Sequence, residues 1–226
     1  MRAWTFGRTS EAAGLRTKQA FGTAFRLGLH AASLAPLALL LYDDWAGRLS
    51  FNPIEDATRR TGQTALALLI LALAVTPLVL VSGRRSLMTV ARPLGLYAML
   101  YASIHLFIFA VLDYGVRLDL LREAVLEKPY ALMGLAAFVL LLATAATSLR
   151  GWPPWLGRRW WRWSQRAVLA AAPLVLLHSL WAVKVITSTH VAYTALVAFL
   201  LVFRVPSLRR RLERRLSEPL PREGAE

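Results

Sequence analysis

The chain has 226 residues, of which 57% are hydrophobic, a formal net charge of +14 and no cysteine. The lack of cysteine excludes disulfides, thiolate metal sites, iron–sulfur clusters and a cysteine nucleophile. The charge does not indicate binding to nucleic acid. The basic residues are instead divided among short intervals between long apolar runs, as membrane topology and contact with membrane lipid require.

Six apolar runs of about 20 residues are long enough to cross the roughly 30 Å hydrocarbon core of a bilayer. A helix satisfies its own backbone hydrogen bonds in lipid, and the two-residue alternation of barrel strands is absent. We therefore predict an all-α, polytopic membrane protein with six transmembrane helices in one bundle, whose short loops make neighbours antiparallel. The predicted spans are Phe21–Tyr42, Gly62–Ser82, Pro93–Leu112, Pro129–Leu149, Trp163–Val183 and Ile186–Val205.

Lys and Arg residues are divided unequally between the two sides of these spans. The two tails, the second–third loop and the fourth–fifth loop hold 18 of the 27, whereas the other three loops hold 7 together with eight of the 13 acidic residues. The positive-inside rule places the Arg-rich side, and both termini, in the cytoplasm. We predict a cytoplasmic tail over residues 1–20, a transmembrane domain over 21–205 and a basic, partly disordered cytoplasmic tail over 206–226.

The loop between the third and fourth spans, residues 117–128, has leucine and valine at helical spacing. This pattern predicts a short helix, which either lies on the outer membrane surface or simply connects the two spans.

None of the six predicted spans contains Asp or Glu. Ion-coupled transporters usually keep an ionisable group at mid-membrane, so this argues against a transporter. It also argues against a bare catalytic metal, which needs three or more protein ligands. A haem iron needs only two axial ligands, because the porphyrin supplies four nitrogens.

Two histidines lie inside spans at matching depths. His105 is 8 residues from the outer end of its span at Asp113, and His178 is 6 residues from the outer end of its span at Lys184. Both spans run outward, so the two imidazoles fall within about one helical turn in depth. They are candidate axial ligands of one haem. The alternative is that each histidine only hydrogen-bonds across a helix interface.

The neighbours of the two histidines suit a flat ligand. Lys184 and Arg117, just beyond the outer ends of the spans, are candidate partners of haem propionates. Small residues on the same helix faces leave room for a porphyrin, although they also serve plain helix packing. These residues are Ala98, Ala102 and Ala171.

Other residues with candidate roles lie away from this pair. His30, nine residues into the first span, lies in the cytoplasmic half and fits three roles: a ligand of a second haem, a partner of a quinone oxygen, or a packing residue. His190, at the outer start of the last span, is interpreted as a solvated or interfacial residue. Tryptophans crowd the fourth–fifth loop, where they indicate an interfacial aromatic belt or part of a quinone or flavin pocket. They are Trp152, Trp155, Trp160, Trp161 and Trp163.

Several short motifs follow one another in a specific order between Leu29 and Val205. They are Leu29-His30, Thr61-Gly62, Thr76-Pro77, Arg92-Pro93-Leu94-Gly95-Leu96-Tyr97 running to His105-Leu106, Lys128-Pro129-Tyr130 with Gly134, Thr147-Ser148, and His178-x-x-Trp181-x-x-Lys184. In these motifs the chain resembles the haem-binding membrane subunit of periplasmic protein-methionine-sulfoxide reductase systems. That family, MsrQ or YedZ, belongs to the ferric-reductase-like transmembrane superfamily.

The resemblance implies a six-helix b-type cytochrome of the bacterial inner membrane, with His105 and His178 as the haem ligands. It implies that electrons come from the quinone pool, with the flavin FMN as a further cofactor. It also implies a heterodimer with a periplasmic, molybdopterin-containing subunit that reduces methionine sulfoxide in proteins. The chain would then be an electron-transfer subunit, with the substrate reduced by its partner.

One position departs from the family pattern. The family usually has a histidine 13 residues before the one matching His178, and here that residue is Gln165. Glutamine is a poor haem ligand, so we predict one haem. Gln165 is a candidate for binding a second cofactor or for a hydrogen bond to a quinone near the cytoplasmic surface. In a straight helix the two residues lie about 20 Å apart and about 140° around the axis, although Pro173 between them can bend it.

A second hypothesis comes from another class: a haem-free polytopic membrane protein, such as an assembly factor or a small-solute permease. The absorption spectrum of the purified protein separates the two, because only a cytochrome shows a Soret band.

Overall fold

The computed structural model describes residues 6–149, 157–183 and 185–204, and among these residues every regular element is a helix. The predicted all-α class is therefore confirmed. The chain divides into two compact units, Met1–Arg48 and Leu49–Glu226.

The first unit contains α1 (Phe6–Trp45), which includes the whole first predicted span. The part of α1 from Gly22 to Trp45 is long and apolar enough to cross a membrane. His30 lies in this part and is exposed within its unit. The place of α1 in a common bundle, and any role of His30 beside a cofactor, stay predictions.

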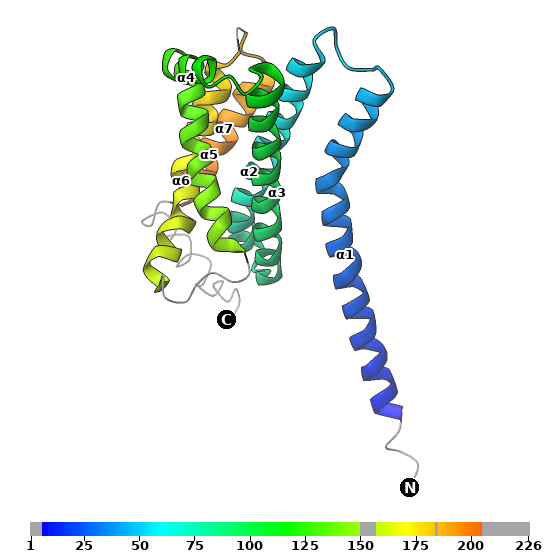
Figure 1. Cartoon of the computed structure of the whole chain (residues 1–226). Coiled ribbons are helices and arrows are strands. Elements are labelled where there is room, and N and C mark those ends of the chain that lie inside the picture. The colour runs from blue at the N-terminus through cyan, green and yellow to red at the C-terminus, as the bar shows by residue number, and fades with distance from the viewer. Residues whose placement is uncertain (1–5, 150–156, 184, 205–226) are drawn as a thin grey trace. The chain divides into compact units, whose positions relative to one another are not determined.

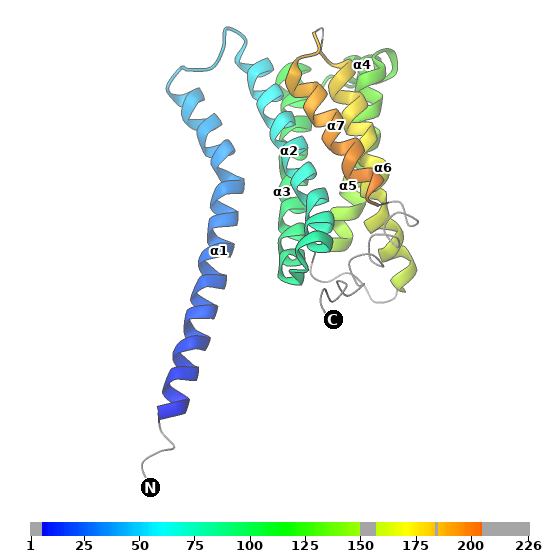
Figure 2. The same cartoon turned by 180° about the vertical axis from the view of Figure 1, so that it is seen from behind.

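The second unit is built around two antiparallel helix hairpins, α2 with α3 and α5 with α6, which are its most extensively packed helix pairs (Figure 1). We call the end where α2, α5 and α7 begin the upper end, and the opposite end the lower end. At the upper end lies the short helix α4, which packs against α5; the turned view shows α7 packed beside α2 and α6 (Figure 2). The elements are α2 (Pro53–Ser82), the 3-10 turn η1 (Arg85–Leu87), α3 (Met88–Phe107), the π-helical segment η2 (Ile108–Asp113), α4 (Leu118–Glu127), α5 (Pro129–Ser148), α6 (Gly157–Trp181) and α7 (Ser188–Val202).

The limits of α2 follow from its capping residues. The Asn52 side chain accepts a hydrogen bond from the backbone N–H of Glu55 at 3.2 Å, and Pro53 occupies the first turn, where its missing N–H costs nothing. Gly83 ends the helix with a φ of 68°, a left-handed conformation that glycine adopts easily, and its N–H bonds to the Val79 carbonyl. The helix thus begins before the predicted span at Gly62, in a polar segment that hydropathy alone does not reveal.

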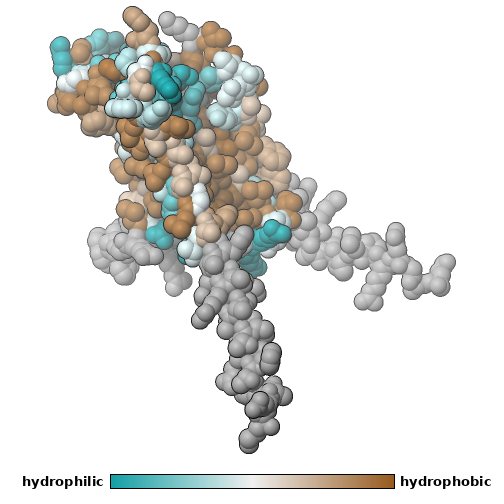
Figure 3. Space-filling view, turned by 90° about the vertical axis from the view of Figure 1, so that its right-hand side faces the viewer, coloured by the Kyte–Doolittle hydropathy of each residue, from teal (hydrophilic) through white to brown (hydrophobic). Residues whose placement is uncertain are grey.

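Five helices of this unit, α2, α3, α5, α6 and α7, contribute buried residues to one core, and these include Leu69, Ala98, Ala137, Ala171 and Val197. Many larger apolar side chains of both units are exposed, and in space-filling view brown, hydrophobic residues predominate between more hydrophilic residues above and below them (Figure 3). Exposed apolar area on this scale is typical of a surface that meets lipid.

Four helices within the described residues are long and apolar enough to cross a membrane. They are Gly22–Trp45, Pro53–Ser82, Arg85–Asp113 and Pro129–Ser148. The chain is therefore a multi-pass membrane protein. α6 starts with a charged and aromatic segment, and α7 is a shorter apolar helix. The count of six spans and the cytoplasmic position of both termini stay predictions.

The loop predicted to be helical is α4, and this prediction is confirmed. The predicted C-terminal tail, residues 206–226, lies outside the described residues.

Candidate functional site

The structure brings His105 and His178 together. They lie near the ends of α3 and α6, which both run toward the upper end, and the two ring centroids are 5.9 Å apart with their planes at 87°. Both side chains are partly buried. Residues 73 positions apart in the chain therefore meet at one level of the bundle, as their matched depths predict.

Each imidazole is held by a backbone carbonyl of the neighbouring helix. Nδ1 of His105 lies 2.8 Å from the Thr58 carbonyl oxygen on α2, and Nδ1 of His178 lies 2.7 Å from the Tyr130 carbonyl oxygen on α5. A carbonyl oxygen only accepts hydrogen bonds, so both Nδ1 atoms carry a proton. In the neutral ring this leaves the lone pair on Nε2, the form in which histidine binds a metal.

A glycine lies beneath each ring. A Cβ atom built on Gly62 would lie 3.0 Å from Nδ1 of His105, and one built on Gly134 would lie 2.6 Å from Nδ1 of His178. Each glycine follows the residue with the accepting carbonyl by four positions, so it lies one turn further along the same helix. The two hairpins thus hold their histidines by the same arrangement: a carbonyl, then a glycine, facing an imidazole.

Ala98 on α3 and Ala171 on α6, predicted to leave room for a porphyrin, are both almost fully buried, and their role beside a haem stays a prediction. Three residues after His105 the helix widens into η2, a π-helical segment, and such segments are frequent at functional sites.

These residues fit a bis-histidine haem. Metal–imidazole bonds are about 2.0–2.1 Å, so two imidazoles that share one metal have their ligating nitrogens about 4 Å apart and their ring centres somewhat further. The observed 5.9 Å between centroids is of this size. No group of three or more metal-binding side chains occurs among the described residues. A haem iron needs only two protein ligands, because the porphyrin supplies the other four.

The other predicted site residues are placed differently. Arg117, a candidate propionate partner, donates to Asp119 at 2.7 Å, and this bond holds the pKa of the Asp119 carboxyl below its usual range. Lys184 lies outside the described residues. His190 caps α7, where its Nδ1 accepts from the Thr187 N–H at 3.4 Å and lies 2.8 Å from the Thr187 hydroxyl.

Three further basic residues at the upper end were not among the predicted site residues, although Lys128 occurs in one of the family motifs. Lys128 immediately precedes α5 and donates to the Tyr114 hydroxyl at 3.0 Å, a bond that raises the pKa of Lys128. Arg59 and Arg60 both pair with the buried Asp56, at 2.8 Å and 3.0 Å. Arg59 and Arg60 directly follow Thr58 in the chain, and this is the only sequence signal that associates these two arginines with the site.

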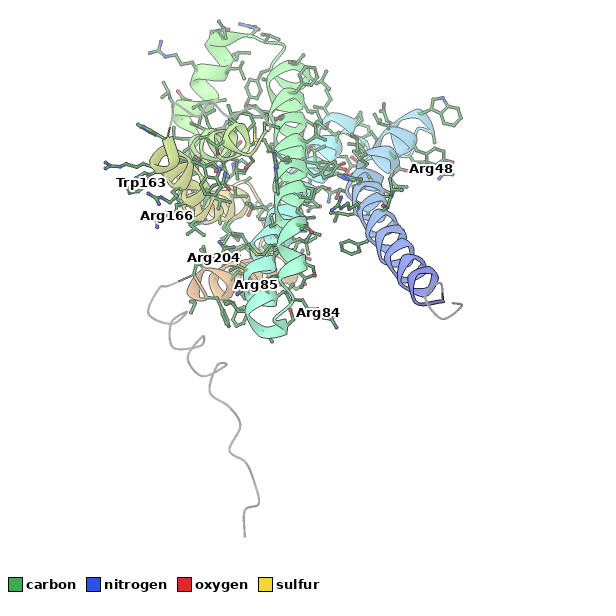
Figure 4. All side chains as sticks on the ribbon, turned by 90° about the horizontal axis from the view of Figure 1, so that it is seen from below. Arg48, Arg84, Arg85, Trp163, Arg166 and Arg204 are labelled. Carbon is green, nitrogen blue, oxygen red and sulfur yellow. The ribbon has the colours of Figure 1, made fainter. Side chains whose placement is uncertain are left out.

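Gln165 belongs to a cluster of polar groups between α5 and α6, below the histidines. Its Nε2 lies 3.0 Å from the Thr147 hydroxyl, 3.0 Å from the Ser148 hydroxyl and 3.3 Å from the Thr144 carbonyl. Gln165 and His178 therefore both contact α5, in contrast to the 140° separation expected for a straight helix. The exposed Trp163 and Arg166 beside it point away from the bundle when it is seen from below (Figure 4).

Comparison with known proteins shows the family to which the chain belongs. Residues 61–177 match the family model described as "Ferric reductase like transmembrane component". Proteins named as heme-binding subunits MsrQ of protein-methionine-sulfoxide reductase are similar over most of the chain. The one from Xanthomonas euvesicatoria pv. vesicatoria is 36% identical over 200 residues, which is 84% of this chain and 91% of that protein. The one from Xanthomonas axonopodis pv. citri is 37% identical over 183 residues, 78% of this chain and 84% of that protein.

A third relative, from Xanthomonas campestris pv. campestris strain 8004, is 36% identical over 188 residues, 80% of this chain and 86% of that protein. No solved structure matches the chain. The chain belongs to the family of ferric-reductase-like transmembrane proteins and, within it, to the MsrQ (YedZ) group.

Proposed function

We propose that the chain is a b-type cytochrome subunit that carries electrons through the bacterial inner membrane. His105 and His178 hold one haem b as its axial ligands. The observation that carries this proposal is the pair of imidazoles 5.9 Å apart, each with its Nδ1 proton directed to a backbone carbonyl. A haem with two imidazole ligands exchanges single electrons and suits electron transfer rather than substrate binding.

The chain's own residues position the ligands. The carbonyls of Thr58 and Tyr130 select the tautomer whose Nε2 binds iron, and they fix the rotation of each ring. Gly62 and Gly134 let each ring approach the neighbouring helix closely. Arg117 and Lys184 are proposed to pair with haem propionates at the upper end.

The electron acceptor is proposed to be a periplasmic, molybdopterin-containing subunit that reduces methionine sulfoxide in proteins and forms a heterodimer with this chain. The names of the similar proteins support this partner, because they describe heme-binding subunits of a methionine-sulfoxide reductase. The electron donor is proposed to be the quinone pool, with FMN as a further cofactor. The chain itself performs no substrate chemistry.

The test is repair of periplasmic methionine sulfoxide in cells that lack this chain. We expect repair to stop when the chain is deleted, and to return with the wild-type chain or the His190→Ala variant but not with His178→Ala. Unchanged repair in the deletion strain, with respiratory donors present, would show that the assigned partner is wrong.

A further inference from the structure

A cavity of about 620 Å³ lies between the two hairpins, toward the lower end from the histidines. Its uppermost lining residues include Leu69 and Leu141, each seven residues further along its helix than Gly62 and Gly134. Seven residues correspond to about 10 Å of helix rise below the histidine level. The volume falls in the range of roughly 300–1,000 Å³ that is usual for small-molecule sites.

Two of the polar residues that line this cavity stand in the same relation to the two histidines. Arg92 lies 13 residues before His105 on α3, and Gln165 lies 13 residues before His178 on α6. The bundle therefore has a second level, about 20 Å along the helices from the first. At the upper level the paired groups are imidazoles, whereas at the lower level they are a guanidinium and an amide.

The chemistry of the lower level suits hydrogen bonds rather than metal ligation. A guanidinium only donates, and it stays protonated. The Gln165 amide nitrogen donates within the hydroxyl cluster of α5, and no described residue donates to the amide oxygen. Gln165 can therefore accept a hydrogen bond from a ligand hydroxyl while Arg92 donates to a ligand oxygen.

The other residues that line the cavity determine which further chemical groups its ligand can have. Neither a histidine nor a carboxylate is among the described residues that line the cavity, whereas iron and hard cations are usually bound by such side chains. Apolar side chains line it toward the histidines, and Trp161 adds an aromatic surface. Arg204, after α7, also lines it and donates to the Leu73 carbonyl at 3.1 Å; Figure 4 labels this residue at the lower end.

We infer that this cavity binds the ring of a quinone, hydrogen-bonded by Gln165 and Arg92, at the level where Gln165 replaces the usual histidine of the family. The inference rests on the proposed function, in which a quinol is the electron donor. Oxidation of the quinol breaks its two O–H bonds and releases two protons to water at the lower end. The two electrons leave one at a time to the one-electron centre that His105 and His178 hold in the proposed function.

The test compares two substitutions of adjacent alanines on α5. Ala145 lines the cavity, whereas Ala146 is exposed and does not. Ala145→Phe fills the cavity, and Ala146→Phe adds the same side chain on the other side of the helix. Both variants, and Gln165→Leu, are purified in lipid nanodiscs, and the binding of decylubiquinone is measured by equilibrium titration alongside haem content.

We expect Ala146→Phe to bind the quinone as the wild type does. Ala145→Phe and Gln165→Leu should bind it at least about tenfold more weakly, a difference of about 1.4 kcal/mol in binding free energy. The haem content of all three variants should equal that of the wild type. Equal binding by Ala145→Phe and Ala146→Phe would overturn the inference, as would two haems per wild-type chain. If the wild type binds the quinone in this cavity but the corresponding quinol does not reduce its haem, the site stands and the donor in the proposed function is wrong.

Discussion

Each histidine of the pair depends on three backbone features of a neighbouring helix rather than on other side chains. The carbonyl of Thr58 or Tyr130 accepts a hydrogen bond from Nδ1–H, and the glycine one turn further along lacks the Cβ that would block the ring. The helix itself keeps the carbonyl and the glycine in register. Because a backbone carbonyl cannot be removed by substitution, the sensitive positions are the histidines and the glycines.

The first prediction concerns the ligands. His105→Ala and His178→Ala should each abolish the low-spin haem spectrum, because loss of one axial bond leaves the iron five-coordinate and weakly held. The readout is the absorption spectrum of oxidised and reduced protein. His190→Ala is the matched control, since His190 caps α7 and should leave the spectrum unchanged. A normal low-spin haem in either ligand variant would rule out bis-histidine ligation.

The second prediction concerns the glycines. Gly134→Ala should lower haem retention and displace His178, because the new methyl group would lie 2.6 Å from Nδ1, and overpacking of this kind costs about 1–3 kcal/mol. Gly62→Ala should have a smaller effect, because the corresponding distance is 3.0 Å. The effects of both substitutions are measured as loss of haem on heating.

Gly28→Ala on α1 is the control for these variants, because nothing lies within 4 Å of its Cβ position. If Gly134→Ala retains haem as well as Gly28→Ala does, the glycine does not position the ring.

At the scale of residues, the sequence predicts the ligands but not what holds them. His105 and His178 stand out because a polar group inside an apolar span is rare. Gly62, Tyr130 and Gly134 occur in the motifs of the family resemblance, but their contacts with the histidines depend on how each helix is rotated about its axis. Periodicity alone does not fix that rotation when a helix is apolar on nearly every face.

At the scale of helices, the apolar cores of the elements were predictable and their ends were less so. The fourth span, predicted as Pro129–Leu149, is α5 at Pro129–Ser148, because Pro129 marks its start. α2 instead begins at Pro53, outside the apolar run, and η2 continues α3 as a π-helix to Asp113. Polar helix turns and π-segments leave little trace in hydropathy.

The third prediction belongs to α6. Gln165→His should raise the haem content above that of the wild type or add a new component to the haem spectrum, because it places an imidazole beside the lower cavity. Pyridine haemochrome analysis and the absorption spectrum measure the two effects. Gln165→Leu supplies no ligand and should leave both at wild-type values. Identical haem content and spectra in Gln165→His and Gln165→Leu would show that no porphyrin fits at this level.

At the scale of the whole molecule, the second unit repeats one arrangement. The α2–α3 and α5–α6 hairpins each bring a carbonyl, a glycine and a histidine together near the upper end, and each lines the lower cavity with a polar residue 13 positions before its histidine. No repeat is visible in the sequence, because the shared features are two glycines, two histidines and their spacing within otherwise interchangeable apolar residues.

We propose that the chain holds one haem b between the two hairpins at the upper level. The most direct measurement is the ratio of haem to protein in the purified wild-type chain, determined by pyridine haemochrome analysis together with the spectrum of the reduced protein. We predict a ratio near one and the sharp α and β bands of a low-spin, six-coordinate b-type haem. A colourless protein at full occupancy, or two haems per chain, would contradict it.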